Sequence, residues 1–315
     1  MFIRLTTMNN GQESYNIFIN KQSGTVLDFG QNYLEARISQ SNINVNKLYF
    51  LSPDALIEKI KKEKNNNTPI LIGGGDGTIK SCATTLMSKD KPFGVLPLGT
   101  MNLLSKDLDI PTQLDKTLHA YKNGVISKKI DVGSVNDEIF LCCASLGAIP
   151  AASKFREKHR NTSKPILIPH LIYYVFEQLD QINSFKVKLK MDKHKINLKT
   201  SSLVISNNQY IPHRDTLSHN FKRPEIQNGL LGIYSLSPRS MWDKFRLLLK
   251  LRFADWKADQ ALQEWQSRYL EIECPSSSVL LALDGEPKHI KTPLHFKILP
   301  KSLKILLPKT KSTNP

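Results

Sequence analysis

The chain has 315 residues, of which 40% are hydrophobic and 23% charged, a composition that excludes collagen, coiled-coil and wholly disordered chains. Lysine and arginine outnumber aspartate and glutamate by 44 to 28, so the formal net charge is +16, which favours polyanionic partners such as nucleic acid, anionic lipid surfaces or phosphorylated metabolites. The four cysteines form no metal or redox motif, and the start lacks a long apolar segment. We therefore expect a reduced, cytoplasmic protein that visits a membrane without crossing it.

The first half of the chain alternates between strand and helix patterns. Short apolar runs predict strands at 15–20, 69–72 and 93–96. Helices are predicted from Pro53 onward, over 79–86 and at 112–121. Such alternation is typical of an α/β domain with a parallel sheet.

From about Asp131 the chain becomes rich in β patterns. The strands predicted here are 185–192, 198–206, 230–236, 270–274 and 279–283. Helical stretches are predicted near 165–180 and 240–267, and the polar tail 309–315 is predicted to be disordered. We expect a boundary near 131–135 between an α/β domain and a β-dominated domain.

A run of glycines between a buried strand and a helix is the most specific signal in the sequence. Residues 73–78 read GGGDGT. Glycine lets backbone N–H groups approach an anion closely, and a helix N-terminus adds unpaired N–H donors and a positive dipole end. Asp76 is a candidate metal ligand beside a phosphate, and Thr78 a candidate hydroxyl donor. The spacing fits neither a Walker A loop nor a Rossmann fingerprint, and a glycine-rich turn without a ligand is the alternative.

A second turn, residues 97–102 with the sequence PLGTMN, also lies between a predicted strand and a helix start. In a parallel sheet the carboxyl ends of neighbouring strands meet at one edge, where ligands bind. We therefore expect the two turns to converge on one nucleotide.

Together these motifs resemble the diacylglycerol kinase catalytic family, the bacterial lipid kinases that include relatives of sphingosine and ceramide kinases. The family's GGDGT stands at 74–78, its P-x-G-T-x-N at 97–102 and its D-G-E at 284–286. Its N-P-x-S-G is similar to residues 20–24, with Lys21 in place of proline. GGDGT is shared with NAD kinases, whereas the late D-G-E and the β-rich second half favour the lipid kinases.

The resemblance implies a nucleotide-binding α/β domain, a β-sandwich-like domain and an active site in the cleft between them. The ATP-binding domain would take 1–134 with a returning segment at about 299–308, and the lipid-substrate domain would take 135–298. The resemblance also implies ATP and Mg²⁺, transfer of the γ-phosphoryl group to a lipid hydroxyl, and peripheral association of a basic surface with an anionic membrane. No nucleic acid is expected, and the oligomeric state, including a homo-oligomer, is left open.

Residue by residue, the resemblance places functional roles on matching positions. Glu286 would be the general base that takes the proton of the lipid hydroxyl, Asp284 would support it from the same face of a strand, and Asp131 would help the metal–water network. The nucleotide-binding residues would be Asn20, Ser23, Gly24, Gly74, Gly75, Asp76, Gly77, Thr78, Thr100 and Asn102. A hairpin turn with a solvated Glu286 is the alternative interpretation of the D-G-E sequence.

Two positions depart from the family pattern. Leu103 stands where the family often has an aspartate, which removes one carboxylate of the metal network. The family's D-G-x-L turn has asparagine in place of aspartate here, which keeps an oxygen ligand and loses the charge. The implied metal ligands are Asp76 and, in the second domain, Glu225, Asn228 and the carbonyl of Leu230.

The stretch 239–257 alternates apolar and basic residues at roughly helical spacing. Its apolar members are Trp242, Phe245, Leu248, Leu249 and Phe253. A basic amphipathic helix lies at an anionic membrane surface or packs its apolar stripe on the protein. Packing is the more common use of such a stripe, so we expect the apolar face to pack on the β-rich domain.

Three alternative functions stay open. An NAD kinase would phosphorylate a soluble ribose and need no micelles or vesicles. A catalytically inactive lipid- or nucleotide-binding relative, suggested by Leu103 and Asn228, would bind ATP without turnover. A basic nucleic-acid-binding protein would bind DNA with a steep salt dependence, although no zinc finger, homeodomain or RNP-like motif is present.

Overall fold

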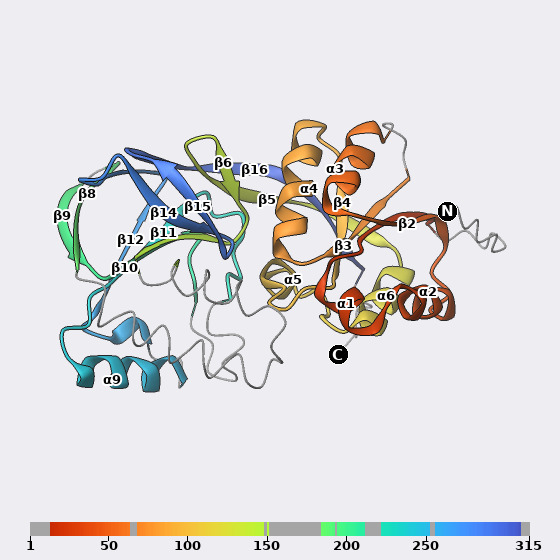
Figure 1. Cartoon of the computed structure of the whole chain (residues 1–315), viewed down its shortest axis with the longest axis horizontal. Helices are drawn as coiled ribbons and strands as arrows, with labels where there is room; N and C mark the ends of the chain where they lie inside the picture. The colour runs from red at the N-terminus through yellow and green to blue at the C-terminus, as the bar shows by residue number, and fades with distance from the viewer. Residues whose placement is uncertain are drawn as a thin grey trace. The chain divides into compact units, whose positions relative to one another are not determined.

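The computed structural model describes residues 13–63, 68–147, 150, 184–192, 194–211, 222–252 and 256–309. These residues divide into two compact units, one with the residues up to Ile130 and from Lys301 onward, the other running from Asp131 to Pro300. Strands β5 (Val125–Val135) and β16 (Leu294–Pro308) carry the chain from one unit to the other (Figure 1). The helix predicted at 165–180 and residues 310–315 of the tail lie outside the described residues. The assignment of ATP and lipid to separate domains stays a prediction.

The first unit is built on a parallel sheet. Its strand order is β2 (Val45–Leu51), β1 (Tyr15–Asn20), β3 (Ile70–Gly74), β4 (Phe93–Pro97) and then the C-terminal part of β16. The chain passes from β1 outward to β2 and then returns to the other side of β1 to form β3. The winding direction therefore reverses between β1 and β3. In open α/β sheets, ligands bind outside the carboxyl ends of the strands at such a switch point.

Helices cover both faces of this sheet, which explains why every residue of β1, β3 and β4 is buried. Figure 1 shows α3 and α4 on one face and α1, α2 and α6 on the other. The helices are α1 (Gly24–Phe29), α2 (Gln31–Gln40), α3 (Pro53–Lys62), α4 (Asp76–Ser88), α5 (Leu103–Asp107) and α6 (Leu114–Lys122). Proline at the first position of α3 is suited to a helix start, because that N–H has no intrahelical partner.

The C-terminal part of β16 lies against β4, with Ile305 paired to Phe93. The fully buried Tyr121 of α6 links the two strands, because its hydroxyl accepts a hydrogen bond from the N–H of Val95 (2.9 Å) and donates to the carbonyl of Leu306 (3.2 Å). Burial raises the pKa of Tyr121, so the hydroxyl keeps its proton and its donor role. A strand from the end of the sequence is thus fixed inside the first unit.

The second unit consists of two antiparallel layers. One layer has the order β12-β11-β10-β7-β14-β15, and the other pairs β9 with β8, β8 with β13, and β13 with the first part of β16. The strands are β6 (Glu138–Phe140), β7 (Cys143–Gly147), β8 (Phe185–Met191), β9 (Lys195–Thr200), β10 (Ser202–Asn207), β11 (Leu231–Leu236), β12 (Leu262–Ser267), β13 (Tyr269–Glu273), β14 (Ser278–Leu283) and β15 (Glu286–Lys291). One hydrophobic core contains residues of both layers. The predicted fold class, an α/β domain followed by a β domain, is confirmed.

Three predictions for the second unit are wrong in part. The single strand predicted at 198–206 is two strands, because the chain turns between Thr200 and Ser202, where the Thr200 hydroxyl bonds the carbonyl of Ser202 (2.8 Å). The helix predicted over 240–267 ends as α9 (Met241–Arg252), and β12 follows after a short 3₁₀ turn at Trp256–Ala258. Pairing with β11 overrides the local helical pattern there. The third concerns Asp284 and is described with the site.

Among the residues described, no helix combines the length and the apolar character that crossing a membrane requires.

Candidate active site

The candidate residues fall in both units, and the first unit carries the glycine turn. Strand β3 ends at Gly74, and Gly75 precedes the first turn of α4 without any side chain capping the helix. A Cβ added at Gly74 would lie 2.5 Å from the Cβ of Thr78, so the close approach of helix and strand requires glycine. The first helical bond runs from the N–H of Ile79 to the carbonyl of Gly75 (3.0 Å). The N–H groups of residues 76–78 precede that bond and form a concentration of positive potential.

The second turn lies against the first, as expected. The N–H of Leu98 donates to the carbonyl of Gly74 (3.0 Å), and a Cβ added at Gly99 would lie 2.5 Å from the Cα of Gly75. The two backbones are in contact at a distance that only glycine allows. The structure therefore brings both turns to the carboxyl ends of the neighbouring strands β3 and β4.

Two of the predicted site residues hold these turns in shape. Asn102 adopts the left-handed conformation (φ 49°), and its amide bonds both the N–H (2.9 Å) and the carbonyl (2.8 Å) of Gly99. One oxygen of the Asp76 carboxylate accepts the N–H of Leu103 (2.7 Å), which ties the start of α4 to the start of α5. Position 103 thus contributes its backbone to the site where the family often contributes a carboxylate.

The segment after β1 completes the first group of candidates. The Asn20 amide donates to the Thr78 hydroxyl (2.8 Å), and the N–H of Thr25 donates to the carbonyl of Leu98 (3.0 Å), so this segment joins both turns. Ser23 is only 4% exposed, and within the described part of the chain its hydroxyl is the buried polar atom that has no hydrogen-bond partner. An unpaired buried hydroxyl costs about 1–3 kcal/mol, which a ligand oxygen at this position would recover.

Gly24 and Thr100, two further candidate nucleotide-binding residues, lie close to each other. A Cβ added at Gly24 would lie 3.9 Å from the Thr100 hydroxyl, and Thr100 itself is exposed. The exposed Thr100 hydroxyl is thus a third candidate donor, beside the Ser23 hydroxyl and the N–H groups at the start of α4.

In the second unit, the D-G-E sequence forms a tight hairpin. Leu283 of β14 pairs with Glu286 of β15, so Asp284 and Gly285 are the two residues of the turn. Both have positive φ, 52° and 85°, as a two-residue hairpin loop of the primed type requires. The prediction that Asp284 and Glu286 share the face of a strand is therefore wrong, because the chain reverses between them.

The hairpin gives its two carboxylates different environments. Asp284 is 5% exposed and accepts the N–H groups of Leu141 (2.8 Å), Cys142 (2.7 Å) and Cys143 (3.0 Å). Glu286, at the first position of β15, is exposed. Asp284 thus anchors the turn on the chain before β7, and Glu286 is left at the solvent-exposed start of β15.

Arg223 supports the same backbone and was not singled out by the sequence. It is 1% exposed, and its Nη1 donates to the carbonyls of Leu141 (2.8 Å), Cys142 (3.1 Å) and Asn207 (2.7 Å). The backbone beside Asp284 is therefore held by a carboxylate on its N–H groups and by a guanidinium on its carbonyls. No spacing pattern distinguishes Arg223 from the other basic residues of the chain.

Asp131 is fully buried and belongs to the second unit. Its carboxylate accepts the N–H of Gly229 (2.7 Å), and its backbone bonds Ile226 (2.9 Å) and the amide of Asn207 (2.8 Å). Asp131 thus orients the turn that carries three of the implied metal ligands.

The three implied ligands are oxygen donors on a largely solvent-exposed turn. Glu225 and Asn228 are exposed, and Leu230 is half-buried. Oxygen donors suit Mg²⁺, but this set holds a single carboxylate, and in the described part of the chain no three His, Cys, Asp or Glu side chains are placed to share a metal ion. The Mg²⁺ site stays a prediction.

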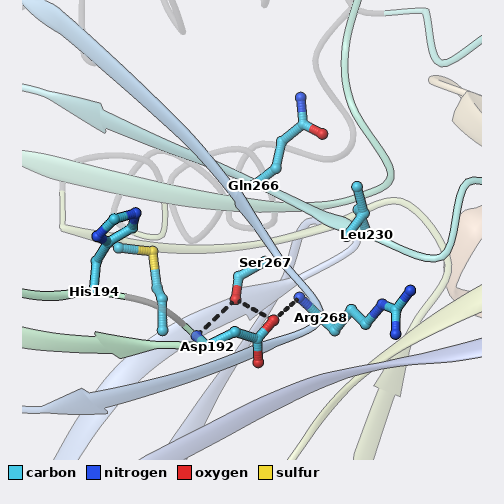
Figure 2. A pocket seen from close by; sticks show the side chains of 7 residues that line it. Asp192, His194, Leu230, Gln266, Ser267 and Arg268 are labelled. Atoms are coloured by element: carbon cyan, nitrogen blue, oxygen red, sulfur yellow. Dashed lines mark hydrogen bonds between the residues drawn. The ribbon is translucent and has the colours of Figure 1, made fainter.

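A cavity of about 540 Å³ opens elsewhere in the second unit. Figure 2 shows its polar corner, where the Asp192 carboxylate accepts the hydroxyl of Ser267 (3.0 Å) and the N–H of Arg268 (2.9 Å). Its lining residues are Met191, Asp192, His194, Leu230, Gln266, Ser267 and Arg268. Leu230 is the one predicted site residue among them.

Comparison with known proteins finds similarity to lipid kinases, strongest in the segment that carries the glycine turns. Residues 14–135 match the family described as diacylglycerol kinase catalytic domain. An uncharacterized protein of Synechocystis is 25% identical over 85% of this chain, which spans 64% of that relative's length. A "probable lipid kinase YegS-like" protein of Shewanella frigidimarina is 26% identical over 93% of each chain.

The fold has a solved counterpart. The crystal structure of a diacylglycerol kinase from Bacillus anthracis matches with a TM-score of 0.67 and 17% identity, over 95% of this chain and 98% of that one. The shared fold therefore extends beyond the matched segment through the β-rich half. Both glycine turns lie within residues 14–135, so the match to the diacylglycerol kinase catalytic domain family rests on the segment that carries them.

Proposed function

We propose that the chain is a lipid kinase that uses ATP and Mg²⁺ to phosphorylate the hydroxyl of diacylglycerol or a related lipid alcohol. The observation that carries this proposal is the junction of the two glycine turns at the carboxyl ends of β1, β3 and β4, with the unpartnered Ser23 hydroxyl beside it. Phosphoryl transfer depends chiefly on positioning and on neutralising charge, and this junction concentrates N–H and hydroxyl donors.

In this proposal the phosphates of ATP lie on the start of α4. The N–H groups of residues 76–78 and the hydroxyls of Ser23 and Thr100 would donate to phosphate oxygens, where the absence of side chains at Gly74 and Gly75 leaves room. Asp76 would hold Mg²⁺ through its carboxylate, which lies at the start of α4 and also accepts the N–H of Leu103. The ion, when bound, neutralises charge on the transferred group.

Glu286 would act as the general base. Its exposed carboxylate takes the proton of the lipid hydroxyl while that oxygen bonds to the γ-phosphorus, and the bond from the γ-phosphorus to the β–γ bridging oxygen breaks to release ADP. The rigid two-residue turn and the anchoring of Asp284 hold Glu286 in a fixed place on β15.

The experiment is transfer of labelled phosphate from ATP in the presence of Mg²⁺. Diacylglycerol, monoacylglycerol, sphingosine, ceramide and phosphatidylglycerol are offered in mixed micelles, and NAD is offered in solution. We expect one lipid to be labelled, and Glu286→Gln to lower that rate about 10²–10⁴-fold, the usual contribution of a positioned general base. Because residue 286 is exposed, the substitution should leave the thermal unfolding midpoint unchanged.

Two other outcomes assign a different function. Labelled NADP without labelled lipid would identify a soluble NAD kinase. ATP binding without any labelled product would identify an inactive relative, and Leu103→Asp together with Asn228→Asp would then be the substitutions expected to restore turnover.

A further inference from the structure

Helix α9 carries large apolar side chains on its solvent side. Met241, Trp242, Phe245 and Leu249 are 57%, 67%, 48% and 44% exposed, and we call them the α9 apolar face. At about 3.6 residues per turn these four positions fall within an arc of roughly 100°. The rings of Trp242 and Phe245 lie together, with centroids 5.8 Å apart. An exposed apolar patch of this kind marks an interaction site.

The rest of α9, from the edge of the apolar face onward, is fixed to the protein partly by charged residues. Arg246 bonds Asp259 through Nε (2.9 Å) and Nη2 (3.1 Å), and Lys250 lies 3.5 Å from the same carboxylate, whose side chain is fully buried. The hydrogen bond from Arg246 lowers the pKa of Asp259, so the anchor stays ionised at neutral pH. Leu247 and Lys244 are buried as well.

This orientation reverses the expectation from the sequence. The apolar stripe is expected to pack on the β-rich domain, but Trp242, Phe245 and Leu249 are exposed, and the attached side combines the buried Leu247 with basic residues. Phe253 and the side chain of Leu248 lie outside the described part of the chain.

We infer that the α9 apolar face inserts into the surface of an anionic lipid bilayer. Residues 239–259 contain six basic and three acidic side chains, and the whole chain carries +16, so an anionic surface complements this region. A second copy of the chain would bring the same excess of positive charge and would be repelled. Tryptophan and phenylalanine are suited to the boundary between lipid head groups and acyl chains. This inference rests on the proposed function, because membrane binding would bring the kinase to its lipid acceptor.

The test measures binding to vesicles made of equal parts phosphatidylglycerol and phosphatidylcholine. We expect the parent to co-sediment with them and to release when salt is raised, because screening weakens the attraction. Trp242→Ala/Phe245→Ala/Leu249→Ala should lower the partition coefficient at least about 100-fold, since three apolar side chains no longer enter the lipid. The matched control is Ile126→Ala, which removes an apolar side chain that is 51% exposed on β5 and should bind as the parent does.

Tryptophan fluorescence identifies the residue that enters the bilayer. Brominated phosphatidylcholine in the same vesicles should quench the parent, and Trp242→Phe should keep binding while losing most of the quenching. Trp256 is 3% exposed and reports no insertion. Unchanged binding of the triple variant, or an unquenched Trp242 in bound protein, would overturn the inference. So would a concentration-dependent dimer of the parent that the triple variant does not form, because the second copy would then cover the face.

Kinase assays in neutral detergent micelles separate the two proposals. If the parent labels lipid in micelles but does not bind the vesicles, the inference about α9 is wrong and the proposed function stands. If the parent binds vesicles through α9 but labels no acceptor, the proposed function fails while the docking surface stands.

Discussion

At the scale of single residues, the two carboxylates of the D-G-E sequence differ in burial and in hydrogen bonding. Asp284 is buried and accepts three backbone N–H groups, whereas Glu286 is exposed. The Asp284 carboxylate is thus engaged by backbone donors inside the protein, whereas the Glu286 carboxylate faces solvent. The position of Glu286 on β15 thus depends on the turn that Asp284 forms.

Removing the Asp284 carboxylate should destabilise the protein. We expect Asp284→Ala to lower the free energy of unfolding by about 3 kcal/mol, because buried N–H groups of Leu141 and Cys142 lose a charged acceptor. Asp284→Asn keeps one acceptor oxygen and should lose less. Urea denaturation measures both, with Glu286→Gln as the exposed control at less than about 0.5 kcal/mol. Equal effects at the two positions would contradict the structural role given to Asp284.

At the scale of elements, the two glycine turns depend on a backbone contact that a single methyl group would break. A Cβ at Gly99 would lie 2.5 Å from the Cα of Gly75, whereas a Cβ at Gly24 would meet nothing closer than 3.8 Å. We expect Gly99→Ala to force the turns apart, to destabilise the fold by about 1–3 kcal/mol and to weaken ATP binding.

Gly24→Ala is the matched control for stability, because α1 has room for the methyl group and alanine favours a helix. Differential scanning calorimetry compares the two variants, and equilibrium binding measures the affinity of the Gly99→Ala protein for ATP. A Gly99→Ala protein as stable as the parent would show that the turns can separate without cost.

The same elements show what the sequence alone can predict. The helical spacing of Ile79, Cys82, Ala83 and Leu86 predicted α4, and these are its buried residues, because one face of an isolated helix must find the core. The strand β12 was missed, since its place beside β11 is decided by long-range pairing that no local period records. The outward face of α9 was missed for a related reason: the buried partner of its basic side, Asp259, lies beyond the helix in the sequence.

Among the site residues, too, locally encoded features were predictable and features decided by long-range contacts were not. The glycine turn was predictable because glycine is the residue that permits close approach of the backbone, and the structure brings both turns together. The orphaned hydroxyl of Ser23 and the buried guanidinium of Arg223 were not predictable in these roles, since burial and missing or multiple partners are properties of the folded chain.

At the scale of the whole molecule, β16 makes the first unit discontinuous in sequence. Its residues from Lys301 onward pair with β4, and Tyr121 fixes them there. The matched segment 14–135 therefore lacks one strand of its own sheet.

A fragment that ends at Val135 should expose the unpaired edge of β4 and self-associate, whereas the full chain should not do so through that edge. Light scattering after size-exclusion chromatography measures this. A monomeric fragment that binds ATP as well as the full chain would contradict the expectation.

The order of translation determines when β16 becomes available to pair with β4. When β4 and α6 leave the ribosome, the segment that completes their sheet, Lys301–Pro308, has still to be translated. At roughly 5–20 residues per second, the growing chain would wait about 10–35 s between the end of β5 and the end of β16. The first unit therefore cannot complete its sheet until the second unit has been translated.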